Sequence, residues 1–441
     1  MFMLESHLSA DQNRVVGVVQ AAAAEANTSL FLTGGAMRDM LGGFPIRDLD
    51  FTIEGNALKI AKALAKRSGA KIVAEDDVRK CAELLFPGGV TAELGMARAE
   101  RYPKPGGKPH VTPATIHDDL RGRDLTLNAV ALSLNRASRG LLIDPTNGLG
   151  DLEHKELRTA YNYALYDDPV RILRLIRLRV RLGFTIDERT RQQYDNVRAE
   201  RLEDHISPQQ RLRELRHIAS DPNPGEVLRA FQEEKLLHLF SPVLAGPKLN
   251  LAGFAKLQKS RQLVPSGVRF AGDDFALFLN VLAERLTPKE RAALASGVGM
   301  PRVDVNAWQK LEGRSKTLER EVKSAKLTRP SQLYQVLSKA PGDQVLFLLL
   351  RSQIRLVTDR IRNYLQKYLP MAQEVTEEEV RAKGVTPATP KFNRVREELI
   401  AAKLNARPKR PVPEEVPPAG PPQPIPSGSL RRAYTRQPSA R

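Results

Sequence analysis

The sequence TGGAMRDMLGGFPIRDLDFTI, residues 33–53, decides the fold of the N-terminal part of this chain. It follows a short apolar run, SLFL at 29–32, and its two glycines open a helical stretch that ends at Gly42 and Gly43. The segment RDLDFTIEG, residues 47–55, alternates apolar and polar side chains as a strand does. We therefore predict a strand, a glycine pair, a helix and a second strand in succession.

Asp48 and Asp50 lie two residues apart in the second predicted strand, so both side chains project from one face. Two carboxylates this close repel each other unless a cation lies between them. Phosphoryl transfer uses such a pair to hold Mg²⁺ against the phosphates of a nucleotide. By itself a D-x-D pair is more often a surface feature or an ion pair with a neighbour such as Arg47.

The glycine pair gives this strand a context. Gly34 and Gly35 let the backbone approach a ligand closely, and a helix N-terminus presents free N–H groups to an anion. Arg38, one turn inside the helix, can reach the same phosphates. A glycine pair alone indicates only a tight turn, but the combination with Arg38 and D-x-D favours a nucleotide site.

The remaining pattern predicts an α+β chain, with a mixed N-terminal part and an all-helical region after it. Helices are expected at 11–26 and 57–69, and strands at 71–74, 81–86 and 89–97. After Leu152 the periods are mainly helical, as in DPVRILRLIRLRVRLGF at 168–184 and SPQQRLRELRHIAS at 207–220. Ser207 and Pro208 are typical of a helix cap and a first helical residue.

The charge of the chain indicates a polyanionic partner. Lys and Arg total 69 against 51 Asp and Glu, a net charge of +18. Such an excess repels itself unless a polyanion neutralises it, so nucleic acid is the leading partner. The segment 406–441 holds nine prolines between 408 and 426 and ends rich in arginine, and we expect it to be disordered.

Other features indicate where the protein acts. The single cysteine, Cys81, excludes intramolecular disulfides and cysteine-rich zinc sites, fits a reducing cytoplasm, and is expected to be a buried inert thiol. The N-terminus lacks a signal-peptide pattern. No apolar run reaches about 20 residues, so no membrane span is expected.

Several motifs together resemble the class II tRNA nucleotidyltransferase and bacterial poly(A) polymerase family, within the polymerase β-like superfamily. Residues 33–53 resemble its G-G-x-x-R-D…D-x-D signature, and TAELGMARAERY (91–102) its third-carboxylate strand. DDLRGRDLTLNAVALS (118–133) is similar to D-L-x-R-R-D-F-T-I-N-A. DDPVRILRLIRLRVRLGF (167–184) is similar to E-D-x-x-R followed by R-A-x-R-F and a closing L-G-F. SPQQRLRELRHI resembles the E-R…E-L helix, so the resemblance extends roughly over 20–405.

The resemblance implies an architecture and a reaction. We expect a catalytic head or palm domain at 1–150, a helical base-recognition neck at 151–225, an RNA-binding body and tail at 226–405, and the disordered segment 406–441. The implied reaction is template-independent addition of CCA to tRNA 3′ ends from CTP and ATP, with two Mg²⁺ ions and pyrophosphate release. A poly(A) polymerase, an enzyme adding only CC or only A, and a non-catalytic RNA-binding descendant are the alternatives.

The resemblance also implies roles for individual residues. Asp48 and Asp50 would ligate Mg²⁺, and Glu93 would share an ion or act as a base, unless it is simply paired with Arg98. The nucleotide-binding residues outside the base-reading pair would be Gly34, Gly35, Arg38, Arg123, Asp124 and Asn128, with Asp39 orienting Arg38. Arg123 suits the triphosphate, and Asp124 suits a ribose hydroxyl.

Asp168 and Arg171, expected three residues apart on one helix face, would read the base. Cytosine and adenine share an amino donor beside a ring-nitrogen acceptor, which a carboxylate and a guanidinium complement. Guanine and uracil would leave these groups unpaired. Arg174 and Arg177 extend the same face and suit phosphate.

Four positions depart from the family pattern. Gly122 stands where the first arginine of R-R-D is usual, Asp167 replaces the glutamate of E-D-x-x-R, and Leu175 and Leu178 replace an alanine and a phenylalanine. These departures bear on nucleotide binding more than on the metal chemistry.

Overall fold

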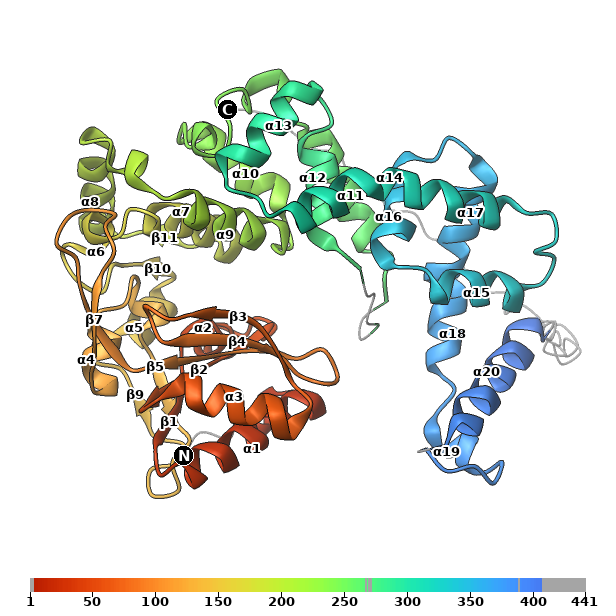
Figure 1. The fold of residues 1–441 in the computed structure, drawn as a ribbon, viewed down its shortest axis with the longest axis horizontal. Coiled ribbons are helices and arrows are strands. Elements are labelled where there is room, and N and C mark those ends of the chain that lie inside the picture. The colour runs from red at the N-terminus through yellow and green to blue at the C-terminus, as the bar shows by residue number, and fades with distance from the viewer. Residues whose placement is uncertain (1–3, 266–267, 269–271, 388, 407–441) are drawn as a thin grey trace, which may run out of the picture.

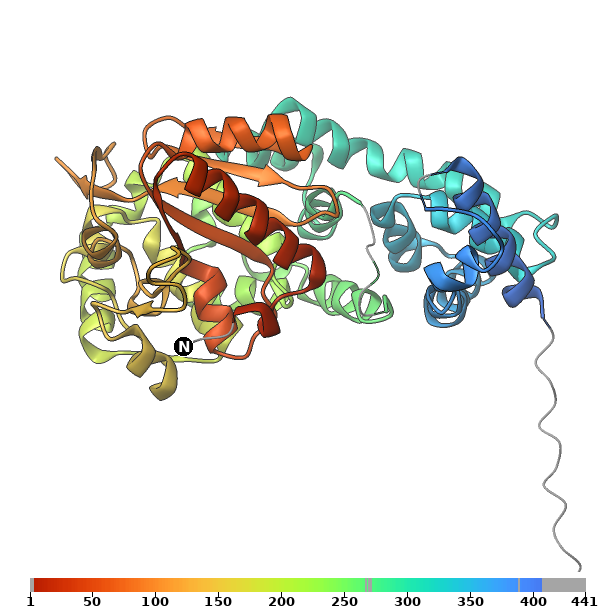
Figure 2. The ribbon, with the colours of Figure 1, turned by 90° about the horizontal axis from the view of Figure 1, so that it is seen from below.

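A computed structural model of the chain describes residues 4–265, 268, 272–387 and 389–406. The N-terminal part contains the main sheet, and a succession of helices leads away from it (Figure 1). In Figure 2 the same helices extend from the sheet-containing end to the opposite end of the molecule. The predicted disordered segment, 406–441, lies outside the described residues except for Ala406.

The head is built on a seven-stranded sheet of order β3-β4-β5-β2-β1-β8-β9. Strand β2 runs parallel to β5 and antiparallel to β1, which places it in the middle of the sheet. The register pairs Asp50 of β2 with Glu93 of β5. The strands are β1 (Ser29–Leu32), β2 (Asp48–Glu54), β3 (Lys71–Asp76), β4 (Cys81–Leu85), β5 (Thr91–Met96), β8 (Ala131–Ser133) and β9 (Leu142–Ile143).

Strand β2 separates an apolar face from a polar one. Leu49, Phe51 and Ile53 are buried in the head core, where α1 (Ala10–Glu25) and α3 (Ala57–Ser68) contribute further apolar side chains. Asp48 and Asp50 alternate with them and so lie on the other face. The alternation that the sequence predicts is confirmed, as is the helix that follows the glycines, α2 (Gly34–Leu41).

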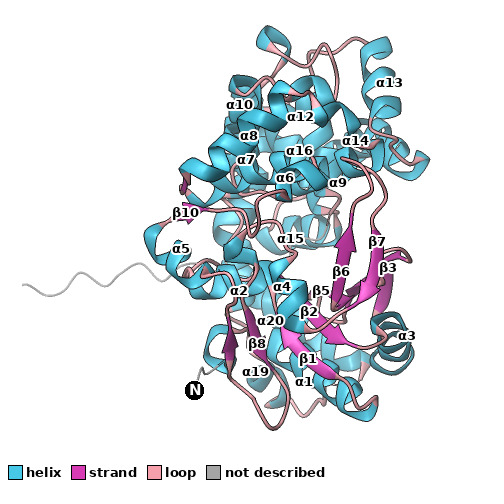
Figure 3. Ribbon diagram, turned by 90° about the vertical axis from the view of Figure 1, so that its left-hand side faces the viewer, coloured by secondary structure: helices cyan, strands magenta, loops and turns pink. Residues whose placement is uncertain are grey.

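A small hairpin and three short helical segments complete the head. Strands β6 (Arg98–Arg101) and β7 (His110–Pro113) form the hairpin, which extends toward the helical part in Figure 3. The chain then forms α4 (Ile116–Arg121), the 3₁₀ turn η2 (Thr126–Asn128) and, after β9, α5 (Gly148–His154). These segments bring Arg123, Asp124 and Asn128 beside β1 and β2.

The rest of the described chain is mainly helical, as predicted, apart from a parallel pair of two-residue strands, β10 (Glu156–Leu157) and β11 (Thr185–Ile186). Its helices are α6 (Ala164–Asp167), α7 (Arg171–Leu182), α8 (Glu188–Ala199), α9 (Pro208–Ala219), α10 (Pro224–Glu233), α11 (Leu251–Arg261), α12 (Asp274–Leu282), α13 (Pro288–Gly297), α14 (Arg302–Lys323), α15 (Pro330–Lys339), α16 (Gly342–Arg351), α17 (Arg355–Asn363), α18 (Leu369–Gln373), α19 (Glu377–Arg381) and α20 (Pro390–Asn405). Within the described ranges, no helix combines the length and hydrophobicity that crossing a bilayer requires.

One predicted helix boundary is wrong. The sequence predicted a helix from Asp168, but α7 begins at Arg171, and Asp168 is extended with φ −130° and ψ 88°. Pro169 explains the difference, because its ring disfavours the helical conformation in the residue before it. Asp168 and Arg171 therefore do not share a helix face, and Asp168 stands in the turn that leads into α7.

Buried apolar side chains form two clusters in the head and several in the helical part. The largest cluster runs from Leu125 to Phe347 and so joins residues on both sides of position 225. Two smaller clusters lie at 318–369 and 372–404. The larger head cluster, residues 4–134, is the one that carries β2 and thus positions the two aspartates.

Candidate active site

The glycine pair lies directly against Asp50. Gly34 has φ +63°, and the Ala36 N–H in the first turn of α2 donates a hydrogen bond to Asp50 Oδ2 at 3.1 Å. A Cβ atom on Gly34 would stand 2.9 Å from that oxygen, and one on Gly35 would stand 3.1 Å from it. The glycines therefore allow α2 to approach the carboxylate and hold it.

Three carboxylates of the central strands come together at this edge of the site. Asp50 is paired in register with Glu93, and Asp48 accepts a hydrogen bond from the Thr91 hydroxyl. Burial raises the pKa of Asp50 to about 7, with repulsion from Glu93 and Asp48 adding to the effect. The Ala36 amide and Arg38 oppose this rise without cancelling it. The ionised form of Asp50 thus lacks a sufficient counter-charge from the protein.

Glu93 is available to act in this group. Arg98, its possible ion-pair partner by sequence, donates instead to Glu100 Oε1 at 2.7 Å. In the described part of the chain no hydrogen bond or ion pair of the Glu93 side chain is found, and the residue is exposed. The alternative in which Glu93 is merely a partner of Arg98 is therefore wrong.

The donor set fits a divalent metal ion. Carboxylate oxygens are the ligands that hard divalent cations prefer, and a cation beside Asp50 would relieve the repulsion that raises its pKa. Among the described residues, however, no three His, Cys, Asp or Glu side chains are grouped closely enough to form a complete metal site. Asp48 and Asp50 therefore suit a shared site in which phosphate oxygens supply further ligands.

Arg38 is held in a buried network that extends into the helical part. Its Nε donates to Asp39 Oδ1 at 2.8 Å and its Nη1 to Asn128 Oδ1 at 2.8 Å. Asp39 also pairs with Arg181 of α7 at 2.5 Å. The ion pair that the sequence proposed between Arg38 and Asp39 is present, and Arg38 joins α2 to the 3₁₀ turn that carries Asn128.

Asp124 is the next member of this network. Its Oδ1 accepts from Asn128 Nδ2 at 3.1 Å, and its Oδ2 pairs with Arg174 at 2.5 Å. Burial alone would raise the pKa of Asp124, but Arg174 and Arg171 outweigh burial and lower it well below its usual range. Asp124 is therefore ionised, and it ties the head to α7.

Arg177 has a different place from that expected by sequence. It is 6% exposed and its Nε donates to Glu214 Oε2 at 3.1 Å. Its charge is thus neutralised within the protein, whereas Arg174 keeps a side chain that is 34% exposed. Of the two arginines, Arg174 is the better placed to meet a ligand.

Arg123 connects three segments beside the glycine pair and Asp50. It donates to the hydroxyls of Thr52 at 2.9 Å and Thr33 at 3.3 Å, and it pairs with Asp119 at 2.8 Å. Thr33 directly precedes the glycine pair, and Thr52 lies within β2, two residues after Asp50. Asp119 was not identified from the sequence, although its i, i+4 spacing to Arg123 is a signal that could have found it.

The proposed base-reading pair is held by residues from three other segments. Gln210 Nε2 donates to Asp168 Oδ1 at 2.9 Å, and Arg79 from the β3–β4 turn lies 3.5 Å from Asp168 Oδ2. Arg171 is 8% exposed and donates to the Tyr161 hydroxyl at 3.0 Å. Asp168 and Arg171 are therefore oriented by different partners, although both residues lie where the chain enters α7.

Gln210 has two functions in one side chain. Its Oε1 accepts from the Ser207 N–H at 3.0 Å and completes the capping box of α9, while its Nε2 holds Asp168. The capping pattern is visible in the sequence, but its second contact is not. Arg79 and Arg181 have no local sequence signal that relates them to the site.

The close approach of Gly34 to Asp50 gives a first prediction. Gly34→Ala is expected to reduce activity strongly, because its Cβ would displace the Asp50 carboxylate, and to destabilise the fold by ~1 kcal/mol through the left-handed backbone. Gly43→Ala is the matched control, since Gly43 has φ +71° and open space at its Cβ position. Thermal unfolding and incorporation assays would separate the two effects, and equal activity of both variants would contradict the assignment.

Comparison with known proteins finds similar sequences and a similar fold. Residues 30–158 match the family model described as "Poly A polymerase head domain". An A-adding tRNA nucleotidyltransferase of Aquifex aeolicus is 29% identical over 76% of this chain and 40% of its own length. A CC-adding tRNA nucleotidyltransferase of Deinococcus radiodurans is 39% identical over 46% of this chain and 53% of its own length. The chain thus spans about half or less of the length of these relatives.

A solved structure shows the same fold along most of the chain. It is described as a CCA-adding enzyme in apo form II, has a TM-score of 0.52 and 24% identity, and the match covers 92% of this chain and 95% of that one. Residues 30–158 therefore match the poly A polymerase head-domain model, and over about three quarters of its length the chain is similar in sequence to an A-adding tRNA nucleotidyltransferase.

Proposed function

We propose that the protein is a tRNA nucleotidyltransferase that adds CCA to tRNA 3′ ends from CTP and ATP, releases pyrophosphate and depends on Mg²⁺. The carrying observation is the group formed by Asp48, Asp50 and Glu93, in which burial and mutual repulsion raise the pKa of Asp50 to about 7. A protein that only bound RNA would gain nothing from clustered carboxylates beside a polyanion. The single cysteine, Cys81, fits action in a reducing cytoplasm.

Asp48 and Asp50 would hold Mg²⁺, which when bound lowers the pKa of the attacking 3′-hydroxyl and neutralises charge on the departing pyrophosphate. Glu93 has a free carboxylate next to Asp50, and its oxygen is suited to accept the hydroxyl proton. Gly34 and Gly35 keep the space beside Asp50 open for phosphate oxygens.

The arginine network would orient the nucleotide. Arg38 and Arg123 carry the positive charge nearest to the glycine pair, and Asn128 and Asp124 hold that charge in place. Arg174 is partly exposed beside Asp124 and suits a triphosphate or the RNA backbone. In this arrangement the buried ion pairs make the site rigid. A rigid site holds the bound nucleotide close to the geometry in which it reacts.

Asp168 and Arg171 would select the base. Asp168 accepts a hydrogen bond from the amino group of cytosine or adenine, and Arg171 donates one to the adjacent ring nitrogen. Gln210 and Tyr161 keep the two side chains in these orientations. Guanine and uracil would leave both groups unpaired in a site where water is largely excluded.

Partial addition is the second candidate, because the relatives include one named as an A-adding and one named as a CC-adding tRNA nucleotidyltransferase. Both candidates use the same carboxylates and the same base-reading pair. They differ in where addition stops, which depends on how the site accommodates the growing 3′ end.

One incorporation experiment distinguishes the candidates. The full chain is incubated with Mg²⁺, with each NTP separately and mixed, and with tRNAs that end before CCA, after CC or after CCA. We expect three added nucleotides followed by a stop on the first tRNA, and loss of addition with EDTA. Addition of CC alone or A alone would establish a partial enzyme, a long A ladder a poly(A) polymerase, and no incorporation would overturn the proposal.

A further inference from the structure

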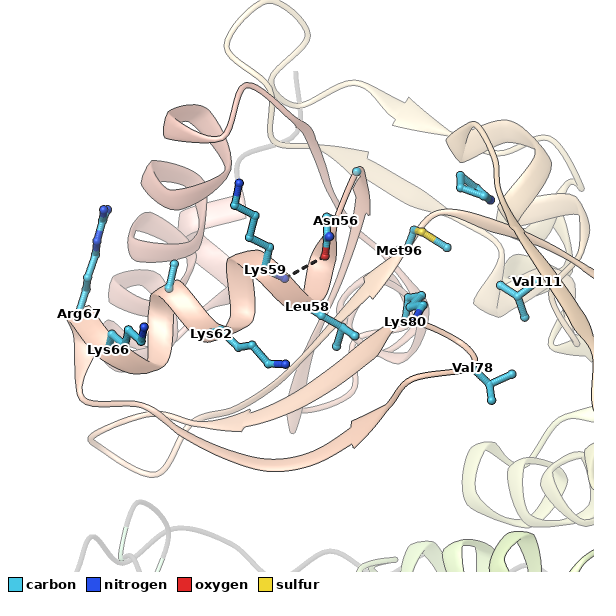
Figure 4. A pocket seen from close by; sticks show the side chains of 13 residues that line it. Asn56, Leu58, Lys59, Lys62, Lys66, Arg67, Val78, Lys80, Met96 and Val111 are labelled. Atoms are coloured by element: carbon cyan, nitrogen blue, oxygen red, sulfur yellow. Dashed lines mark hydrogen bonds between the residues drawn. The ribbon is translucent and has the colours of Figure 1, made fainter.

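A groove of about 940 Å³ lies on the side of the head that α3 covers. Figure 4 shows α3 along one wall and the β3–β4 turn, the end of β5 and the β6–β7 hairpin around the rest. Asp48 and Asp50 lie on the other face of β2, away from the face that packs on the head core. A ligand in this groove would therefore not occupy the candidate active site.

The groove is strongly cationic. Five of its lining side chains are basic and none is acidic: Lys59, Lys62, Lys66, Arg67 and Lys80. Lys59, Lys62 and Lys66 recur at spacings of three and four on α3, so they lie along one face of that helix. Like charges at these spacings repel each other by a few tenths of a kcal/mol, and an anion beside the row would relieve that repulsion.

Three of these five basic side chains have an acidic partner in the protein. Lys62 pairs with Glu75 at 3.2 Å and Lys80 with Asp77 at 4.0 Å, and Arg67 pairs with Glu25. All three basic side chains are about half exposed or more, so the pairs are weak and exchange readily with a ligand. In the described part of the chain the Lys59 and Lys66 side chains have no ion pair.

Apart from Asn56, the rest of the lining is apolar, and it contains no aromatic ring. It consists of Leu58, Ala63, Val78, Met96, Val111 and Pro113, together with Gly55 and Asn56. Val78 is 44% exposed, so its side chain is open to contact with a ligand in the groove. Single-stranded RNA is usually held by bases stacked on aromatic side chains, and such side chains are lacking among the lining residues.

We propose that this groove docks an acidic amphipathic helix of a partner protein. Such a helix would lie beside α3, whose 12 residues extend over about 18 Å, with its apolar side chains against Val78, Met96 and Val111. Acidic side chains on its flanks would pair with Lys59, Lys62 and Lys66. This inference does not depend on the nucleotide chemistry, because the groove and the carboxylates lie on different faces of the head.

The test uses the full chain and a fluorescent peptide of about 18 residues in which leucines form one helical face and glutamates the other. A scrambled peptide of equal composition keeps the charge but has no apolar face. Replacement of Lys59, Lys62 and Lys66 by Gln is expected to weaken binding of the amphipathic peptide roughly tenfold. Val78→Asn is expected to weaken it about threefold without changing the charge.

A matched variant controls for net charge. Lys71, Lys104 and Lys108 are exposed in the same domain and lie outside the groove lining, so their replacement by Gln removes an equal charge. This variant is expected to bind the peptide as the unaltered chain does. Equal binding by the groove and control variants, or equal binding of the scrambled peptide, would overturn the proposal.

The same variants decide between protein and RNA as the occupant. Affinity for a labelled oligoadenylate and for tRNA is measured in parallel, with thermal unfolding as the check on folding. We expect RNA affinity to fall equally in the groove and control variants. Selective loss of RNA affinity in the groove variant, with peptide binding unchanged, would assign the groove to RNA and overturn the proposal.

Discussion

Asp50→Asn is expected to reduce nucleotide incorporation by ~10³-fold or more while it raises the stability of the metal-free protein. The amide keeps the shape of the carboxylate and can still meet the Ala36 N–H through its carbonyl oxygen. It carries no charge, so it neither holds a cation nor repels Glu93 and Asp48. Single-turnover incorporation and thermal unfolding in EDTA would measure both effects, with RNA binding expected to be unchanged.

The stability effect has a defined pH window. The pKa of Asp50 rises to about 7 in the folded protein, because of burial and its acidic neighbours, above its ordinary value of 3.8. The folded protein therefore retains a proton that the unfolded chain releases, and its stability falls as pH rises between these two values. We expect the advantage of Asp50→Asn to be largest above pH 7 and to disappear toward pH 4.

Asp48→Asn is the matched comparison for this prediction. Replacement of Asp48 is expected to abolish incorporation, because a carboxylate that would hold the metal ion is lost. Because Asp48 is exposed, its replacement is expected to raise stability less than Asp50→Asn does. Undiminished incorporation in either variant would contradict the metal assignment. An equal stability gain at pH 4 and pH 8 would contradict the explanation from the Asp50 carboxylate.

Arg171→Ala is expected to lower discrimination against GTP and UTP by roughly 5- to 150-fold, which corresponds to ~1–3 kcal/mol for one unpaired polar group. The guanidinium is buried and is oriented by the Tyr161 hydroxyl and the carbonyls of Ala164 and Gly122. Without it, nothing donates to the ring nitrogen that distinguishes cytosine and adenine. Competition between NTPs for incorporation into one tRNA would measure the ratio.

Two further variants separate base reading from general damage. Tyr161→Phe removes only the hydroxyl that accepts from Arg171, so we expect a smaller loss of discrimination than in Arg171→Ala. Arg179→Ala removes an arginine of the same helix that pairs with Glu234, and we expect it to retain discrimination. If Arg171→Ala selects nucleotides as the unaltered protein does, the base-reading role is wrong.

Local patterns were sufficient for much of the fold and for the central carboxylates. The alternation in β2 predicted that Asp48 and Asp50 share a face, and the glycines predicted the start of α2. The capping residues Ser207 and Pro208 predicted the start of α9. These features depend on neighbours within a few residues, where backbone geometry and side-chain periodicity act directly.

Local patterns did not predict one helix boundary or the side-chain contacts between distant segments. Pro169 moves the start of α7 to Arg171, although the helical pattern of 168–184 predicted a start at Asp168. Arg98 pairs with Glu100, and among the described residues no ion pair of Glu93 is found, which the D-x-D strand alone does not indicate. The roles of Arg79 and Gln210 at Asp168 arise from segments far apart in the sequence.

The sequence by itself determined that the head is an α+β domain and that two aspartates and a glycine pair lie close together. The tertiary structure alone decided which charges remain available there. It places the partly buried Asp50 beside Glu93 and so raises the pKa of Asp50, and it pairs Arg177 with Glu214 while Arg174 stays partly exposed. The physical reason is that periodicity places a side chain on a face, whereas its charge state depends on burial and on partners from the whole chain.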